Sequence, residues 1–121
     1  LDCDGKIDTL IPMWLDSGIN VLYPIEIGTC GNDPVELRRR FGPELRMMGG
    51  FDKRILAGTK SDIEKEVARL APLAHEGGFI GFCDHYVPPD VPLDNYRFYV
   101  DKIREMWGQG VHLPPLGDLA G

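Results

Sequence analysis

The chain has 121 residues, with 13 Lys and Arg against 19 Asp and Glu, and a formal net charge of −6 at pH 7. This length suits one compact domain, and the negative charge argues against nucleic acid or an anionic membrane as a partner. The three cysteines have no paired spacing, and no apolar run approaches the roughly 18 residues that a spanning helix needs. We therefore expect a cytoplasmic protein.

The two ends of the chain set the limits of the predicted domain. The chain starts with Leu1 rather than Met, and residues 1–5 have the pattern of the end of a strand. We therefore expect the carboxyl-terminal part of a longer protein, with its domain over residues 1–110. Residues 111–121 contain a Pro-Pro pair, and we expect them to form an extended tail.

Between these ends, short apolar runs alternate with helical patterns. The predicted strands are residues 19–23, 45–48 and 79–82. The predicted helices are residues 12–16, 33–41, 61–76 and 94–107. The strands are spaced as in βαβ units, so the sheet should be parallel.

Local signals set the boundaries of these elements. Asp33 is followed by Pro and an acidic residue, which predicts an N-cap. Ser61 opens a capping box and Asp94 is the expected cap of the last helix. Pro72 should bend the end of its helix, and the pair Gly49-Gly50 should close the second strand.

Together, four strand ends and four helices predict the α/β class, with parallel βα units that form the carboxyl-terminal half of a (β/α)8 TIM-type barrel. Half a barrel has two open edges and an exposed inner face. It should therefore pair with its missing amino-terminal half, with a second copy of itself, or with another subunit.

Chemically reactive side chains gather where the predicted strands end. Alternate residues of a strand share a face, so Asp2 and Asp4 should project together, as should Cys83 and His85. A cluster of carboxylate, imidazole and thiolate groups can bind a Zn²⁺-like ion or transfer protons. The predicted metal ligands are Asp2, Asp4, Cys83 and His85, and the predicted substrate-binding residues are Asp2, Asp4, Glu26 and Asp52.

Each of these residues also has an ordinary structural role. Asp4 precedes a glycine and suits a turn, Cys83 suits a small buried position, and Glu26 can accept hydrogen bonds from loop N–H groups. The position of His85 favours a role in the site, because this residue lies at the end of a strand and the following Pro-Pro loop fixes its backbone. His75 and His112 are expected to be inert.

Several segments, in order, resemble the uroporphyrinogen decarboxylase superfamily. Residues 85–92 are similar to its last strand and loop, which carry a His-x-(Val/Ile)-x-Pro-Asp-Val-Pro stretch. The other matching segments are Asp2-Cys3-Asp4-Gly5, Pro24-Ile25-Glu26, Asp33-Pro34-Val35-Glu36-Leu37, Arg40-Phe41-Gly42, Gly49-Gly50-Phe51-Asp52 and Gly77-Gly78-Phe79-Ile80. The superfamily fold is a (β/α)8 barrel, so the resemblance implies the same half-barrel.

The resemblance implies two activities. Uroporphyrinogen decarboxylases remove acetate carboxyls from a cyclic tetrapyrrole without a cofactor, and His85 resembles their catalytic histidine on the last strand. Corrinoid-dependent methyltransferases of the superfamily bind zinc through a His-x-Cys pair and a later Cys. Here Asp2-x-Asp4 stands in the place of the pair and His85 in the place of the later ligand, and carboxylates suit a harder ion or no ion.

We therefore expect part of a decarboxylase for a small-molecule substrate of the uroporphyrinogen type, without a cofactor. The alternative is a methyltransferase that uses a divalent metal and a corrinoid. A rival from another class is a non-catalytic half-barrel that serves in binding or assembly.

Overall fold

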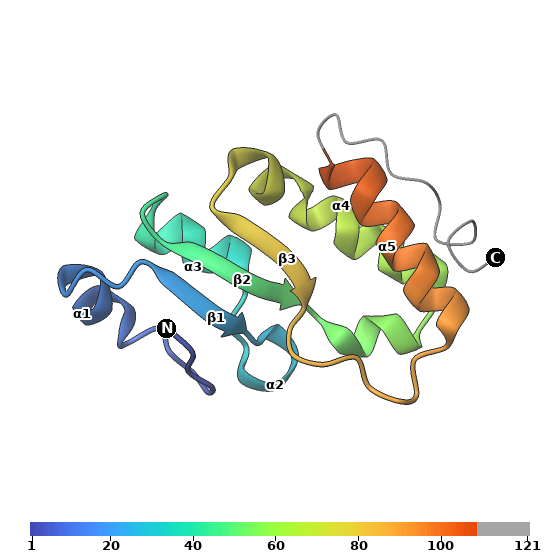
Figure 1. Ribbon diagram of the computed structural model, residues 1–121, viewed down its shortest axis with the longest axis horizontal. Helices are drawn as coiled ribbons and strands as arrows, with labels where there is room; N and C mark the ends of the chain where they lie inside the picture. Colours follow the sequence, from blue (N-terminus) through green and yellow to red (C-terminus); the bar gives the residue numbers. More distant parts are fainter. Residues whose placement is uncertain (109–121) are drawn as a thin grey trace.

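The structure is a computed structural model that describes residues 1–108, apart from the side chain of Thr29, so the predicted tail lies outside the described residues. Figure 1 shows the path of the chain. The elements are α1 (Ile11–Asp16), β1 (Val21–Ile25), α2 (Ile27–Cys30), α3 (Pro34–Phe41), β2 (Arg46–Phe51), the 3₁₀ helix η1 (Lys53–Ala57), α4 (Lys60–Glu76), β3 (Phe79–Cys83) and α5 (Leu93–Trp107).

The three strands form a parallel sheet in the order β1-β2-β3. Asp2 makes a single parallel bridge with Tyr23, so the first residues of the chain lie beside β1 where a fourth strand would run. The α/β class, the parallel strands and their alternation with helices are thereby confirmed. The arrangement is that of part of a (β/α)8 barrel.

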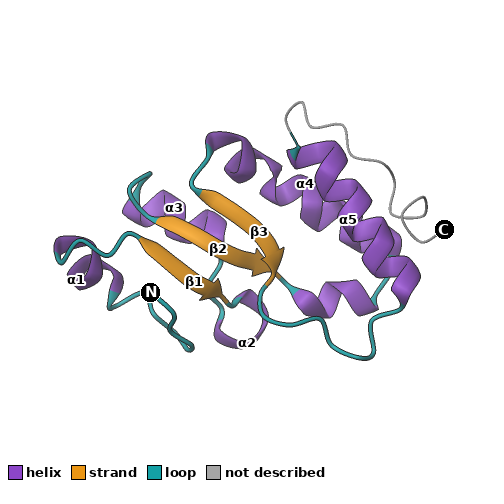
Figure 2. Cartoon of the chain, in the orientation of Figure 1, coloured by secondary structure: helices purple, strands orange, loops and turns teal. Residues whose placement is uncertain are grey.

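One face of the sheet is covered and the other is open. In Figure 2, α3, α4 and α5 lie on one side of the strands, and on that side Leu22 and Met47 are buried in the first core cluster. On the opposite face, Tyr23 is 38% exposed and Ile80 is 61% exposed, and no helix of the described residues covers them. This open face is the one that would line a closed barrel.

A second core joins α4, α5 and η1 to the ends of β2 and β3. It contains buried Phe51, Leu70, Cys83 and Tyr99. The indole of Trp107 packs against β3 because Gly81 has no side chain: a Cβ there would overlap the indole ring. The Trp107 Nε1–H also donates to the Val67 backbone oxygen at 2.8 Å.

Two predicted strand boundaries were wrong. β1 begins and ends two residues later than predicted, and Pro24, which has no N–H, lies at an irregularity of the ladder between Leu22 and Ile25. Gly49 and Gly50 do not close β2 but lie inside it, with φ of 106° and 81°. A Cβ on Gly50 would lie 2.7 Å from Pro34 Cγ, so glycine permits α3 to approach the sheet.

Two predicted caps were also wrong. Thr59, not Ser61, caps α4 and accepts a hydrogen bond from the Asp62 N–H. The N-cap of α5 is Pro92, and Asp94 lies in the first turn. The short helices α2 and η1 were not predicted. No helix among residues 1–108 is long and apolar enough to cross a membrane.

Candidate functional site

The carboxyl ends of the parallel strands bring acidic residues and a histidine to one edge of the sheet. Glu26 follows β1, Asp52 follows β2, and Asp84 and His85 follow β3. Asp4 comes two residues after the bridge that Asp2 makes with Tyr23. Because parallel strands all end on the same side, these residues share one rim, which is where β/α barrels place their reactive groups.

Asp4, Glu26 and His85 lie together on this rim. Each offers one ligand atom, and these atoms all lie within 4.8 Å of one another. Asp4 and His85 are exposed, and Glu26 is half-buried. We call these three residues the rim cluster.

Asn32 connects the two segments that carry the acids of the rim cluster. This residue is 3% exposed. Its side-chain Nδ2–H donates to the Gly5 backbone oxygen at 2.7 Å, and its backbone N–H donates to the Glu26 backbone oxygen at 3.1 Å. Asn32 therefore links the turn that carries Asp4 to Glu26, the residue after β1. No sequence pattern singled out Asn32, because its partners are backbone atoms of distant segments.

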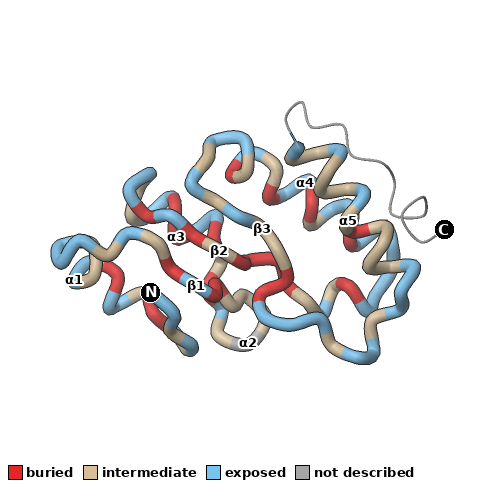
Figure 3. Tube along the Cα trace, in the orientation of Figure 1, coloured by how far each residue is buried: buried red, intermediate tan, exposed pale blue. Residues whose placement is uncertain are grey.

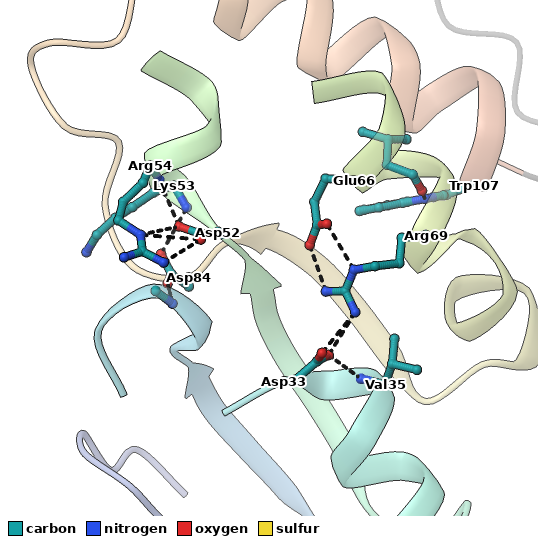
Figure 4. Close-up of polar contacts among 11 residues, drawn as sticks. Asp33, Val35, Asp52, Lys53, Arg54, Glu66, Arg69, Asp84 and Trp107 are labelled. Atoms are coloured by element: carbon teal, nitrogen blue, oxygen red, sulfur yellow. Dashed lines mark hydrogen bonds and ion pairs between the residues drawn. The ribbon is translucent and has the colours of Figure 1, made fainter. Parts of the chain in front are cut away.

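Asp84 holds the third segment of the rim in place. Its carboxylate is fully buried and accepts hydrogen bonds from the Gly28 N–H at 3.0 Å and the Lys53 N–H at 3.3 Å. The end of β3 is thus attached to α2 on one side and to η1 on the other (Figure 4). This fixes the backbone from which His85 projects.

Asp52 lies on the rim but belongs to a different interaction. Its carboxylate caps η1 through the Arg54 N–H at 3.0 Å and pairs with the Arg54 guanidinium at 2.8 Å (Figure 4). Burial works against ionisation of Asp52, but the hydrogen bonds with Arg54 outweigh it and hold the pKa of this carboxyl below its usual range. Gly28 packs so closely here that a Cβ would lie 2.8 Å from Asp52 Oδ1.

Cys83 and Asp2 are placed apart from the rim cluster. Cys83 is 4% exposed in the second core, so it does not share a face with His85 as expected, because β3 ends at Cys83 and the chain turns. Burial raises the pKa of the Cys83 thiol to about 11. Asp2 is exposed beside Tyr23 and is not a member of the rim cluster, whose ligand atoms all lie within 4.8 Å of one another.

Cys30, in contrast, lies against the rim cluster. Its Sγ–H donates to Glu26 Oε2 at 3.4 Å. Burial, and then the hydrogen bond to the Glu26 carboxylate, raise the pKa of this thiol. The sequence pattern gave no reason to select Cys30, although its spacing of four residues from Glu26 was visible.

An open cleft with charged side chains lies outside the sheet, between η1 and α4. This open cleft has a volume of about 670 Å³ and contains acidic and basic side chains in equal number. Within it, Arg69 binds Glu66 at 2.7 Å and Asp33 at 3.0 Å (Figure 4), so the charged groups compensate one another. The rim cluster therefore remains the stronger candidate site.

The donor set of the rim cluster fits a divalent metal ion. Atoms that share an ion at about 2.0–2.6 Å lie no more than about 5 Å apart, and the ligand atoms of Asp4, Glu26 and His85 meet this condition. Two carboxylates and one imidazole can also hold and move protons without a metal. Figure 3 shows that the loop after β3, which carries His85, is largely exposed, so small molecules can reach the rim.

Comparison with known proteins agrees with this architecture. The family model described as Uroporphyrinogen decarboxylase (URO-D) matches residues 3–106. Proteins named uroporphyrinogen decarboxylase are similar to this chain: one from Legionella pneumophila (strain Corby) is 32% identical over 64% of the chain, and one from Pseudomonas putida is 29% identical over 80%. These matches cover 22% and 28% of those relatives' own lengths, so the chain spans about a quarter of them. The chain belongs to the uroporphyrinogen decarboxylase (URO-D) family.

Proposed function

We propose that this chain provides the reaction centre of a URO-D-family enzyme that binds a divalent metal ion through Asp4, Glu26 and His85. The observation that carries the proposal is the approach of their three ligand atoms to within 4.8 Å at the carboxyl ends of the strands. Two carboxylates and an imidazole are an ordinary donor set for such ions. Asn32 and Asp84 support the proposal, since their hydrogen bonds join the segments that carry the three ligands.

A bound ion would act as a Lewis acid that orients a small substrate and stabilises negative charge on it. Asp4 and Glu26 would supply the negative charge that retains the ion, and His85 would complete the set from the segment after β3. The reaction class that this arrangement suits is methyl transfer, with a methylated small molecule as the donor and a corrinoid as the acceptor.

Cofactor-free decarboxylation of a uroporphyrinogen-type tetrapyrrole is the second candidate. It is favoured by the names of the relatives and by the exposed position of His85. In this reaction the C–C bond to an acetate carboxyl breaks, CO₂ leaves, and the carbon takes up a proton. His85 would position the departing carboxylate, and Asp4 and Glu26 would stabilise positive charge on the protonated pyrrole.

The open face of the sheet suggests how the site is completed. The relatives are about four times as long as the matched part of this chain, which leaves enough residues for further β/α units. We expect such units, from a longer chain or a second copy, to cover Tyr23, Ile80 and their neighbours and to enclose the rim.

Native mass spectrometry of the protein that carries this chain tests the first candidate. We expect a bound divalent ion that is lost in Asp4→Asn, Glu26→Gln and His85→Gln but retained in Asp16→Asn, an exposed control on α1. A native protein that stays free of metal after incubation with Zn²⁺, Mn²⁺ and Mg²⁺ would contradict it. Turnover of uroporphyrinogen that persists in excess chelator would support the second candidate instead.

A further inference from the structure

Lys53 brings a positive charge to the rim, next to the segment that carries His85. It is the first residue of η1, and its backbone N–H donates to the buried Asp84 carboxylate at 3.3 Å. Its Nζ lies 5.2 Å from the centre of the Tyr86 ring. The same ring meets the His85 imidazole edge-on, with 5.0 Å between the ring centres. One aromatic ring therefore contacts both Lys53 and a member of the rim cluster.

The charge of Lys53 is not paired with a carboxylate. The neighbouring cation, Arg54, pairs with Asp52 at 2.8 Å (Figure 4). Lys53 forms no ion pair within residues 1–108, although its positive charge acts at longer range on Asp52 and Cys83. A cation–π contact holds an ammonium group in place but leaves its N–H groups able to bind an oxygen acceptor. Lys53 is half-buried and Tyr86 is 65% exposed, so a small molecule can reach this pair.

A second lysine over an aromatic ring shows what distinguishes Lys53. Lys60, an exposed residue at the start of α4, has its Nζ 5.8 Å from the centre of the Phe98 ring. That ring is shared with Lys102, at 5.6 Å, and belongs to α5 on the helical side of the sheet. The contact between lysine and ring is therefore not sufficient to mark a site. Lys53 differs because its ring partner also contacts His85.

We propose that Lys53 binds a carboxylate group of the substrate, and that Tyr86 holds the ammonium in position for it. The inference rests on the proposed reaction centre, and it applies to either candidate reaction because both place a small molecule at this rim. A divalent ion would balance the charges of Asp4 and Glu26, so the additional charge of Lys53 would favour an anionic substrate. The rim should therefore prefer a carboxylic acid to the neutral amide of the same shape.

A pair of probes that differ in charge tests this preference. Benzoate and benzamide have the same ring and similar shape, and ligand-observed NMR titration of the protein that carries this chain measures both affinities. We expect at least about a tenfold preference for benzoate in native protein, its loss in Lys53→Gln and its recovery in Lys53→Arg. Lys60→Gln is the matched control and should keep the native preference, because it removes a lysine from a ring that lies away from the rim.

The role of the ring is tested in the same titration. Tyr86→Phe retains the aromatic face and should keep the preference for benzoate, whereas Tyr86→Leu should reduce it. Tyr86 is largely exposed, so neither change should disturb the fold.

The outcomes separate this inference from the proposed metal site. Equal affinity of native protein for the two probes, failure to bind benzoate, or an unchanged preference in Lys53→Gln overturns the role of Lys53, whether or not a divalent ion binds. A preference that depends on Lys53 in a protein that binds no divalent ion supports the carboxylate site and overturns the metal site alone.

Discussion

Asp84 and His85 are neighbours in sequence, yet the structure uses them in opposite ways. Asp84 is fully buried, and both of its oxygens accept backbone N–H groups from other segments. His85 is exposed and meets Asp4 and Glu26 in the rim cluster. Two adjacent residues on one rim of a β/α unit can therefore differ in role: one holds the framework, and the other faces the rim cluster.

The largest effect is expected at the buried carboxylate. Asp84→Ala should lower the free energy of unfolding by about 3 kcal/mol, because it leaves the Gly28 and Lys53 N–H groups without their charged acceptor. Urea unfolding followed by circular dichroism measures this loss. Asp101→Asn on the exposed side of α5 is the control and should change stability by no more than about 0.5 kcal/mol. Equal effects in the two variants would mean that Asp84 does not hold the rim.

For His85, the exposed neighbour of Asp84, we expect a change in metal affinity with little change in stability. His85→Gln should reduce metal affinity by about 10- to 100-fold, with a change in unfolding free energy of no more than about 0.5 kcal/mol. Calorimetric metal titration and urea unfolding of the same preparation measure both quantities. A loss of stability without a loss of affinity would place His85 among the framework residues and remove the distinction.

A change at Asn32 should lower both the free energy of unfolding and the metal affinity, each by less than the changes at Asp84 and His85. Asn32→Ala removes the hydrogen bond to the Gly5 oxygen and should cost about 1 kcal/mol of stability. It should also weaken metal binding, because the turn that carries Asp4 loses its attachment to the segment after Glu26. If unfolding and metal titrations show lower stability but native affinity, the Asp4 turn is held in place by other contacts.

The smallest effect is expected at Asp52, as a change in pH dependence. The pKa of the folded carboxyl lies below its unfolded value, so its contribution is fully present above the unfolded pKa, about 3.9, and is lost as pH falls through the folded pKa. Asp52→Asn should therefore flatten the acid side of the stability curve by less than about 1 kcal/mol. Unfolding measured from pH 5 to pH 2 tests this, and an unchanged slope would contradict it.

The predictable part of the fold is the part with local chemical signals. Asp33 caps α3 as expected and accepts from the Val35 N–H at 3.0 Å, because an N-cap and Pro at the next position act within one turn. The strands were recognised by their apolar residues. Their ends were misplaced at Pro24 and Gly49-Gly50, residues that usually interrupt strands. At Gly50 the close approach of Pro34 at the start of α3 requires a glycine inside β2, and this overrides that tendency.

The sequence predicts where the candidate site lies better than it predicts which residues belong to it. Asp4, Glu26 and His85 follow strand ends, and parallel topology brings strand ends together. The separation of Cys83 from His85 depends on where β3 stops, which the alternation of residues does not reveal. Asn32, Asp84 and Cys30 act through contacts between distant or short segments, so no periodic pattern marks them.

The position of Trp107 against Gly81 gives the protein an intrinsic optical label. The indole lies over the backbone of β3 and donates a hydrogen bond to α4, so its emission depends on α5 remaining docked on both. Trp14 is the other tryptophan and packs at the opposite core, where it would contribute a separate signal. In a Trp14→Phe background, fluorescence would therefore follow the attachment of the last helix independently of the half that contains the rim acids.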